Sequence, residues 1–299
     1  MGDKMGFKTI YIEETNEISL YLNNLKLKIE EEDVLIPLAD IEILLIDNIK
    51  CFLSSQLLIK LVEFKVGVIL CGLNHMPLFT LLPLHGHFAQ TGRLHEQLNW
   101  KIDRKLQLHK MIVMNKIKNQ LKILVNLGTK NDAVKTLIKY INEVEDGDKT
   151  NREGLAAKLY FQALFGNDFI RGEDDLANHL LNYGYSILKS MISKVLSTFG
   201  LNMNIGIFHR SKTNSVNLCY DIIEVFRPIV DSFVIGEIKN NIEIIDKKKY
   251  INYLTQNFIL NGMKQRIITM MERYVKNVLD FLSASKDYEG LTYENDNFV

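Results

Sequence analysis

The sequence predicts an α+β protein in which a small β-rich domain, residues 1–90, precedes a larger all-helical domain, residues 91–299. Two observations predict this division. Short apolar stretches with strand character, separated by turn sequences, fill roughly the first 85 residues. From Leu84 to Arg227 the chain contains no proline, and its apolar residues recur every three or four positions, which is the helical period.

The β-rich domain is predicted to contain a hairpin, further strands and one helix. The stretch ISLYLNNLKLKIE alternates on both sides of Asn23-Asn24, and asparagine tolerates the positive φ of a tight turn, so we expect a hairpin there. The segment SSQLLIKLVEF has apolar residues at helical spacing, with Ser54 or Ser55 as its N-cap. Further strands are expected at VLIP, ADIEILLID, VGVILCG and LFTLLPL.

The composition is that of an ordinary globular protein, with 47% apolar residues, 24% charged residues and zero net charge. The three cysteines, Cys51, Cys71 and Cys219, form no CxxC pair and lie in apolar stretches, which predicts buried reduced thiols. No apolar stretch reaches the ~18 residues of a membrane span, and the first residues do not resemble a signal peptide. We therefore expect a cytoplasmic protein with no membrane contact.

Positive charge is concentrated in one part of the chain. Between Arg93 and Tyr140 there are eleven lysines and arginines but only three acidic residues. This excess is typical of a solvated helix surface, and it is also what a phosphate-binding face requires. Five of the basic residues stand at helical spacings that allow a shared face: Lys101, Arg104, Lys105, Lys118 and Lys122.

Two acidic residues in DIIEVFRP are candidates for chemistry. Asp221 and Glu224 are three apart and share a face if this stretch is helical. Two such carboxylates need a positive group between or beside them. A divalent cation meets this need, and so does an ion-pair network with Arg227. Pro228 bends or ends a helix just beyond the pair.

His209 and Glu153 are further candidates, each with a simpler explanation. His209 begins a polar loop, where a lone histidine is usually just exposed, although an imidazole joined by carboxylates favours Mn²⁺ or Mg²⁺ over a thiolate-type zinc site. Glu153 follows Thr150 in the T-x-x-E pattern of a capping box. It can instead project from the first turn of its helix into a cleft.

A long amphipathic helix is predicted in EDDLANHLLNYGYSILKSMISKVL. Asn178, Asn182 and Tyr183 interrupt its apolar pattern and are expected to form hydrogen bonds between helices, while Gly184 allows close helix approach. The sequence contains no GxGxxG, GxxxxGK[ST], GxSxG or HExxH motif. The interpretations as an ATP-, NAD- or serine-hydrolase-type enzyme therefore lose their main support.

Taken in order, these segments resemble one known family. IPLADIEILLID and VGVILCGLNHMPL are followed by EGLAAKLYFQALFG, NHLLNYGYSILKS, GIFH and NLCYDIIEVFRPIVD. The chain thus resembles the CRISPR-associated integrases that insert new spacers into CRISPR arrays, and most closely the members from type II systems. The LNYGY and DxxExFRP blocks, in this order and spacing, are the most specific part of the match.

The resemblance implies a catalytic site in the helical domain. Its metal ligands would be Glu153, His209 and Glu224, binding Mg²⁺ or Mn²⁺. Many members have aspartate at the last position. Asp221 would lie beside the metal and bind it directly or through water, and Arg227 would orient carboxylates or touch DNA.

The resemblance also implies the reaction and the partners. A 3′-hydroxyl of a protospacer attacks a phosphodiester of the CRISPR repeat, without ATP. The β-rich domain would form a homodimer, and two dimers would flank a dimer of a small ferredoxin-like partner protein. The basic helices would hold double-stranded DNA and repeat DNA, and the type II effector nuclease and an accessory protein are further partners. The alternatives are an inactive DNA-binding scaffold of the same fold and a free-standing metal-dependent nuclease.

Overall fold

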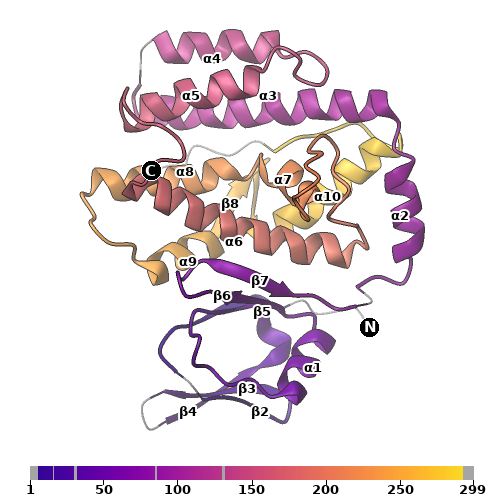
Figure 1. Ribbon diagram of the computed structural model, residues 1–299, viewed down its shortest axis with the longest axis vertical. Coiled ribbons are helices and arrows are strands. Elements are labelled where there is room, and N and C mark those ends of the chain that lie inside the picture. Colours follow the sequence, from indigo (N-terminus) through magenta and orange to yellow (C-terminus); the bar gives the residue numbers. More distant parts are fainter. Residues whose placement is uncertain (1–5, 16, 30–31, 85, 130–131, 292–299) are drawn as a thin grey trace. The chain divides into compact units, whose positions relative to one another are not determined.

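The computed structural model describes residues 6–291 except 16, 30–31, 85 and 130–131. The chain divides into two compact units, residues 1–88 and 89–299. Figure 1 labels the elements of both units along the chain. Each unit buries apolar side chains of its own.

The N-terminal unit contains two sheets. In the four-stranded sheet, with order β1-β5-β6-β7, the first three strands are parallel and β7 is antiparallel to β6. The second sheet is an antiparallel meander, β2-β3-β4. The bounds are β1 Lys8–Ile12, β2 Ile18–Tyr21, β3 Asn24–Ile29, β4 Glu32–Pro37, β5 Ile41–Ile46, β6 Gly67–Cys71 and β7 Pro77–Leu81, and a 3₁₀ turn, Leu38–Asp40, precedes β5.

The predicted hairpin is present, but its turn lies one residue earlier than expected. Tyr21 pairs with Asn24, so the turn residues are Leu22 and Asn23, and Asn24 already belongs to β3. Leu22, not an asparagine, takes the positive φ of 54° and is exposed. Pairing register decides this position, because it places Leu25 and Leu27 of β3 in the core. Glu30, the last residue of the predicted hairpin, lies outside the described residues.

One helix, α1 (Ser55–Glu63), packs into the core of this unit. Ser54 is its N-cap, and its hydroxyl accepts a hydrogen bond from the Leu57 N–H at 3.2 Å, as predicted. Leu57 and Leu61 bury the apolar face of α1 against the strands. All six residues of β5 are buried, as expected for a parallel strand covered on both faces.

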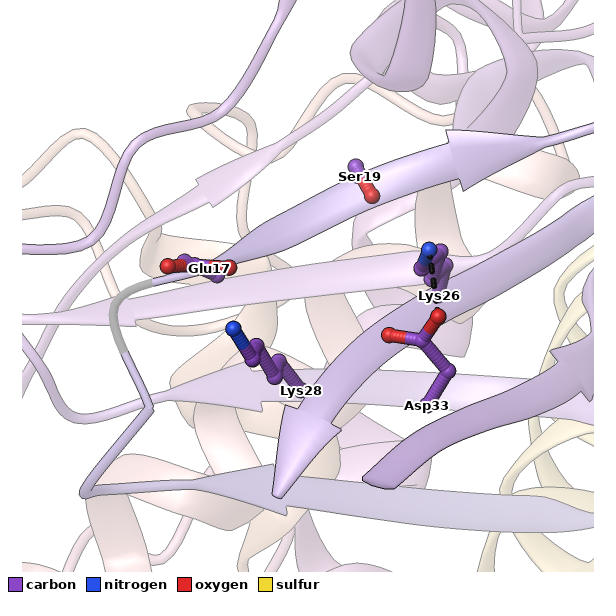
Figure 2. Close-up of a pocket in the computed structure, with 5 residues that line it drawn as sticks. All are labelled: Glu17, Ser19, Lys26, Lys28 and Asp33. Carbon is purple, nitrogen blue, oxygen red and sulfur yellow. Dashed lines mark ion pairs between the residues drawn. The ribbon is translucent and has the colours of Figure 1, made fainter. Parts of the chain in front are cut away.

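The exposed face of the antiparallel meander carries a polar hollow of about 460 Å³. Its lining residues are Glu17, Ser19, Lys26, Lys28 and Asp33; all but Glu17, which directly precedes β2, lie on the three strands of the meander (Figure 2). Lys26 forms an ion pair with Asp33 at 2.7 Å. Acidic and basic side chains therefore lie next to each other on this surface, so it does not favour a ligand of one charge.

The C-terminal unit consists of nine described helices and one hairpin. The helices are α2 Gln90–Leu98, α3 Ile102–Asn126, α4 Asp132–Glu143, α5 Arg152–Phe165, α6 Leu176–Thr198, α7 Asn217–Ile223, α8 Arg227–Lys239, α9 Lys247–Thr255 and α10 Ile267–Leu282. In Figure 1, α3, α4 and α5 lie side by side as one layer, and each contacts the other two. In the other layer α6 packs against α7, α8 and α10, and α3 joins the layers by its contacts with α8 and α10. No helix in the described ranges combines the length and apolarity needed to span a membrane.

The prediction of a purely helical second domain needs one correction. Strands β8 (Asn257–Leu260) and β9 (Met263–Arg266) form an antiparallel hairpin ahead of α10. Its turn residues, Asn261 and Gly262, both have positive φ, at 49° and 74°. Asn-Gly is a strong hairpin signal because these residues adopt that conformation at low cost. The signal was therefore present in the sequence.

Gly184 lets α6 approach its neighbours closely, as predicted. A Cβ at this position would clash with the Tyr250 hydroxyl of α9 and with Val230 of α8. Asn178 on the same helix is buried, and its amide donates to the Ile170 carbonyl at 2.9 Å. Gly184 therefore allows close contact with α8 and α9, whereas the Asn178 side chain bonds to residues that precede α6, in place of the predicted hydrogen bond between helices.

Candidate functional site

Asp221 organises the loop that carries His209. Its carboxylate is fully buried on α7. It accepts hydrogen bonds from the backbone N–H groups of Ile207, Phe208 (3.3 Å) and His209 (3.0 Å). A buried carboxylate needs such donors, and here they come from three successive residues of one loop. Asp221 therefore fixes the backbone of residues 207–209.

Two neighbours complete this loop. A Cβ at Gly206 would clash with the His209 carbonyl and with the Asp221 carboxylate, so only glycine allows the loop to close this tightly. The Asn217 amide donates to the carbonyls of Asn204 (3.1 Å) and Ser211 (2.9 Å), tying both sides of the loop to α7. Asn217 was not identified as a functional residue from the sequence.

His209 is held in one orientation. Its Nδ1 lies 2.5 Å from Asp221 Oδ1, and this hydrogen bond raises the pKa of His209, with the charges of Glu224 and Glu153 adding to the effect. With Nδ1 engaged, Nε2 is the nitrogen left for a ligand, an arrangement common to metal-binding histidines. His209 is thus a partly exposed imidazole whose ring orientation is fixed by the buried Asp221 carboxylate.

Glu153 does not form the predicted capping box. Asn151, not Thr150, is the N-cap of α5, and its side chain accepts from the Gly154 N–H. The backbone N–H groups of Arg152 and Glu153 donate to Asp148, at 2.8 and 3.0 Å. Because other side chains cap the helix, the Glu153 carboxylate is free to project away from α5.

Glu224 stands at the junction between α7 and α8. It is the C-cap residue of α7, and Pro228 lies in the first turn of α8, where a missing N–H costs nothing. The proline thus begins a second helix after the break predicted from the sequence. Glu224 pairs with Arg227 at 3.0 Å, whereas Asp221 faces the His209 loop, so the predicted three-residue ion-pair network is only partly present.

A lysine that the sequence analysis did not single out joins the two glutamates. Lys116 of α3 contacts Glu153 Oε1 at 2.6 Å and Glu224 Oε2 at 2.5 Å through its Nζ. Burial alone would lower the pKa of Lys116, but the charges of the two glutamates outweigh it and raise the pKa. The Lys116 charge in turn is the main reason that the pKa of Glu153 lies well below its usual range.

His109, also on α3, lies against the same cluster. Its ring stacks on Phe208, with centroids 3.8 Å apart, and its Nε2 is 4.0 Å from Glu153 Oε2. Within the described part of the chain, no group of three His, Cys, Asp or Glu side chains is arranged to hold a metal ion. The cation that both glutamates contact here is the Lys116 ammonium. The donor set of two carboxylates and an imidazole nevertheless suits Mg²⁺ or Mn²⁺.

Helix α8 buries a further acidic residue, Asp231. Burial raises its pKa to about 6, although Tyr185 donates a hydrogen bond to its carboxylate. Because its folded-state pKa lies above the unfolded value of 3.8, Asp231 makes its full contribution to the free energy of unfolding below about pH 4. This contribution is lost as the pH rises through about 6.

The substitution Asp231→Asn should therefore change the pH dependence of stability. Relative to wild type, the variant should gain roughly 2–3 kcal/mol in the free energy of unfolding between pH 4 and pH 7.5, at 1.36 kcal/mol per pKa unit. Urea unfolding of both proteins at several pH values measures this difference. A difference that stays constant with pH would contradict the prediction.

The predicted basic residues lie in different environments. Lys105 donates to the Gly206 carbonyl at 3.1 Å, and Arg104 lies over the Phe281 ring, 4.8 Å from its centroid. Arg227 pairs with Glu224 and covers the Tyr185 ring. Burial is the main reason that the pKa of Lys105 is lowered. Of the remaining residues, Lys101 and Lys118 are exposed and Lys122 is half-buried.

Comparison with known proteins identifies the family. The profile described as "CRISPR associated protein Cas1" matches residues 10–273, which is most of the chain. The chain belongs to the Cas1 family. This family member is 36% identical over 232 residues to a CRISPR-associated endonuclease Cas1 of Neisseria meningitidis, covering 77% of this chain and 76% of the relative. A CRISPR-associated endonuclease Cas1 of Francisella tularensis subsp. novicida is 28% identical over 218 residues, covering 63% and 69%.

Solved structures share the fold of this Cas1 family member. A Cas1 protein from Thermotoga maritima superimposes with a TM-score of 0.77 and 16% identity, covering 95% of this chain and 99% of the other. A casposase bound to its integration product gives a TM-score of 0.74 and 20% identity, covering 95% and 92%. The shared fold, with a strand-rich region ahead of a helical region in this chain, is the α+β class predicted from the sequence.

Proposed function

We propose that this Cas1 family member is a divalent-metal-dependent DNA integrase that joins protospacer 3′-hydroxyls to CRISPR repeat DNA. One observation carries the proposal. Glu153 of α5 and Glu224 of the α7–α8 junction contact one buried cation, and the charges of both glutamates act on His209. Carboxylates brought together from separate elements with an imidazole are the donors that a phosphoryl-transfer metal site needs.

Each residue of the cluster has a role in this proposal. A bound Mg²⁺ or Mn²⁺ supplies Lewis-acid stabilisation of charge on the phosphate and the leaving oxygen. Glu153, Glu224 and His209 Nε2 would be its ligands. The Asp221 carboxylate takes part in four hydrogen bonds, three with backbone N–H groups of the loop and one with His209 Nδ1, so its oxygens are already occupied. Asp221 is therefore a positioning residue, and Arg227 positions Glu224 through their ion pair.

The family relationship supports the partners of the proposed reaction. The N-terminal unit would form the homodimer, and two dimers would flank a dimer of the small ferredoxin-like partner. Solved structures of similar fold include an assembly described as a Cas6-RT-Cas1–Cas2 complex, with a TM-score of 0.73 and 18% identity. Contacts with the type II effector nuclease and the accessory protein, which the resemblance of the sequence to type II members implies, belong to the same proposal.

For DNA binding, the exposed lysines of the basic segment are the better candidates. Lys101→Ala and Lys118→Ala should each weaken binding of duplex DNA and reduce the slope of log K against log salt by about 0.9, the loss of one phosphate contact. Fluorescence anisotropy with labelled duplex DNA at several salt concentrations measures the slope. The control is Lys60→Ala, which should leave the slope unchanged. Lys60 is a partly exposed lysine of α1 that pairs with Glu63. Unchanged slopes for both test variants would mean that these lysines face away from the DNA.

A strand-transfer assay tests the proposed reaction. The purified protein is incubated with a duplex protospacer and repeat DNA, with and without the small partner protein, in Mn²⁺, Mg²⁺ or EDTA. We expect joined products in either metal and none in EDTA. Binding of branched DNA without joining in any metal would favour the inactive scaffold. Indiscriminate DNA degradation that the partner does not alter would favour the free-standing nuclease.

A further inference from the structure

The contacts of Lys116 also bear on a question beyond the proposed reaction, namely what neutralises the two glutamates before a metal ion binds. We infer that the Lys116 ammonium takes the place of the divalent cation in the metal-free protein and leaves both glutamates when the cation binds. This inference rests on the proposed metal site. It assigns Lys116 a role in setting metal affinity, which makes it a positioning residue.

The geometry gives the ammonium and the metal the same ligands. Nζ contacts one oxygen of each glutamate, Glu153 Oε1 and Glu224 Oε2. The other oxygen of Glu224 pairs with Arg227, and the other oxygen of Glu153 faces His109. A cation bound by both glutamates therefore has to compete for lone pairs that Lys116 occupies.

Two cations contact Glu224, and Lys116 has the more flexible side chain of the two. Its charge is compact and sits at the end of a flexible four-carbon stem. The Arg227 guanidinium, by contrast, is held over the Tyr185 ring at 4.6 Å from the centroid. Withdrawal of one side chain along its own stem would open the site without a change in the backbone of α3.

The exchange has an energetic reason. The side chain of Glu224 is only 5% exposed, and that of Lys116 only 11%. The side chain of Glu153, the other carboxylate, is 24% exposed, so the two glutamates are only partly solvated and would repel each other without a counter-charge. Lys116 thus keeps the metal-free site assembled, and the same contacts weaken metal binding because they must be broken first.

The test is a metal titration of the full-length protein, with Lys116→Met against a matched control, Lys110→Met. Lys110 lies on the same helix, but its Nζ pairs with Asp146 at 3.5 Å and not with Glu153 or Glu224. Isothermal titration calorimetry with Mn²⁺ gives the dissociation constants. Lys116→Met should bind Mn²⁺ at least about tenfold more tightly than wild type, whereas Lys110→Met should change affinity only by the weaker through-space effect of one lost charge.

Thermal unfolding supplies a second readout. Without metal, Lys116→Met should unfold at a lower temperature than wild type, and saturating Mn²⁺ should raise its Tm by more than it raises that of wild type. Lys116→Gln, which keeps a hydrogen-bond donor without the charge, should change affinity in the same direction and serves if the methionine variant does not fold without metal.

The outcomes separate this inference from the proposed function. The inference is overturned if both Lys116 variants bind Mn²⁺ no more tightly than wild type and Lys110→Met do. In that case, loss of Mn²⁺ binding in Glu224→Gln would still support the metal site. Wild-type Mn²⁺ affinity in Glu224→Gln would overturn the metal site itself and the inference with it.

Discussion

Glu224→Gln should abolish joining of a duplex protospacer to repeat DNA, with a loss of rate on the order of a thousandfold or more. The substitution preserves the size of the side chain and removes the charge that a metal ligand must carry. Lys116 keeps Glu153 as a partner, so the helical unit should remain folded. Gel analysis of joined products in Mn²⁺, with DNA affinity measured by anisotropy, checks the expectation.

Glu237→Gln is the matched control for this experiment. Glu237 is also a buried glutamate in an ion pair, with Lys249 at 2.5 Å, but it lies in α8 and its partner lies in α9, and neither helix carries Glu153, His209 or Glu224. It should join DNA at a rate close to that of wild type. Normal joining by Glu224→Gln would show that Glu224 is not a ligand, and an equal loss in both variants would point to a general effect of the lost charge.

Asp221→Asn should have the second largest effect, with a different signature. The buried carboxylate accepts from three backbone N–H groups, and an asparagine offers one acceptor oxygen and places its own N–H₂ against the remaining donors. We expect a loss of roughly 3 kcal/mol or more in the free energy of unfolding, because buried donors are left unsatisfied. Joining should also fall, since the loop and His209 are no longer held.

The two variants together distinguish a ligand from a positioning residue. Glu224→Gln should lose joining and Mn²⁺ affinity with only a modest change in stability, whereas Asp221→Asn should lose stability along with both. Urea unfolding and calorimetry on the two proteins measure these quantities side by side. An Asp221→Asn protein as stable as wild type, yet unable to bind Mn²⁺, would mean that Asp221 is itself a ligand.

The local features were predicted well from the sequence where short-range chemistry decides them. The Ser54 cap, the strands at Ile41–Ile46 and Gly67–Cys71, and the close approach at Gly184 were confirmed. The capping box of Glu153 was wrong, because Asp148 and Asn151 supply the capping oxygens. The Asn261-Gly262 turn was missed although its signal is strong.

The candidate residues were named chiefly through the family resemblance, since the residue pattern alone left an ion-pair network and a metal site equally open. The structure shows which groups these candidate residues contact. Asp221 turns toward the backbone of the His209 loop, and Glu224 turns toward Lys116 and Arg227. Their assignment as metal ligands and as the positioning residue remains a prediction for the experiments above.

The sequence by itself determined the division into a β-rich and a helical part, the spacing of Asp221 and Glu224, and the break at Pro228, because propensity, periodicity and proline chemistry act over a few residues. Only the tertiary structure decided which positive charge meets the glutamates. In the sequence Lys116 is one of eleven basic residues in a single segment. The packing of α3 against α5 and α8 buries this lysine between Glu153 and Glu224, and burial and charge partners depend on contacts between residues far apart in the chain.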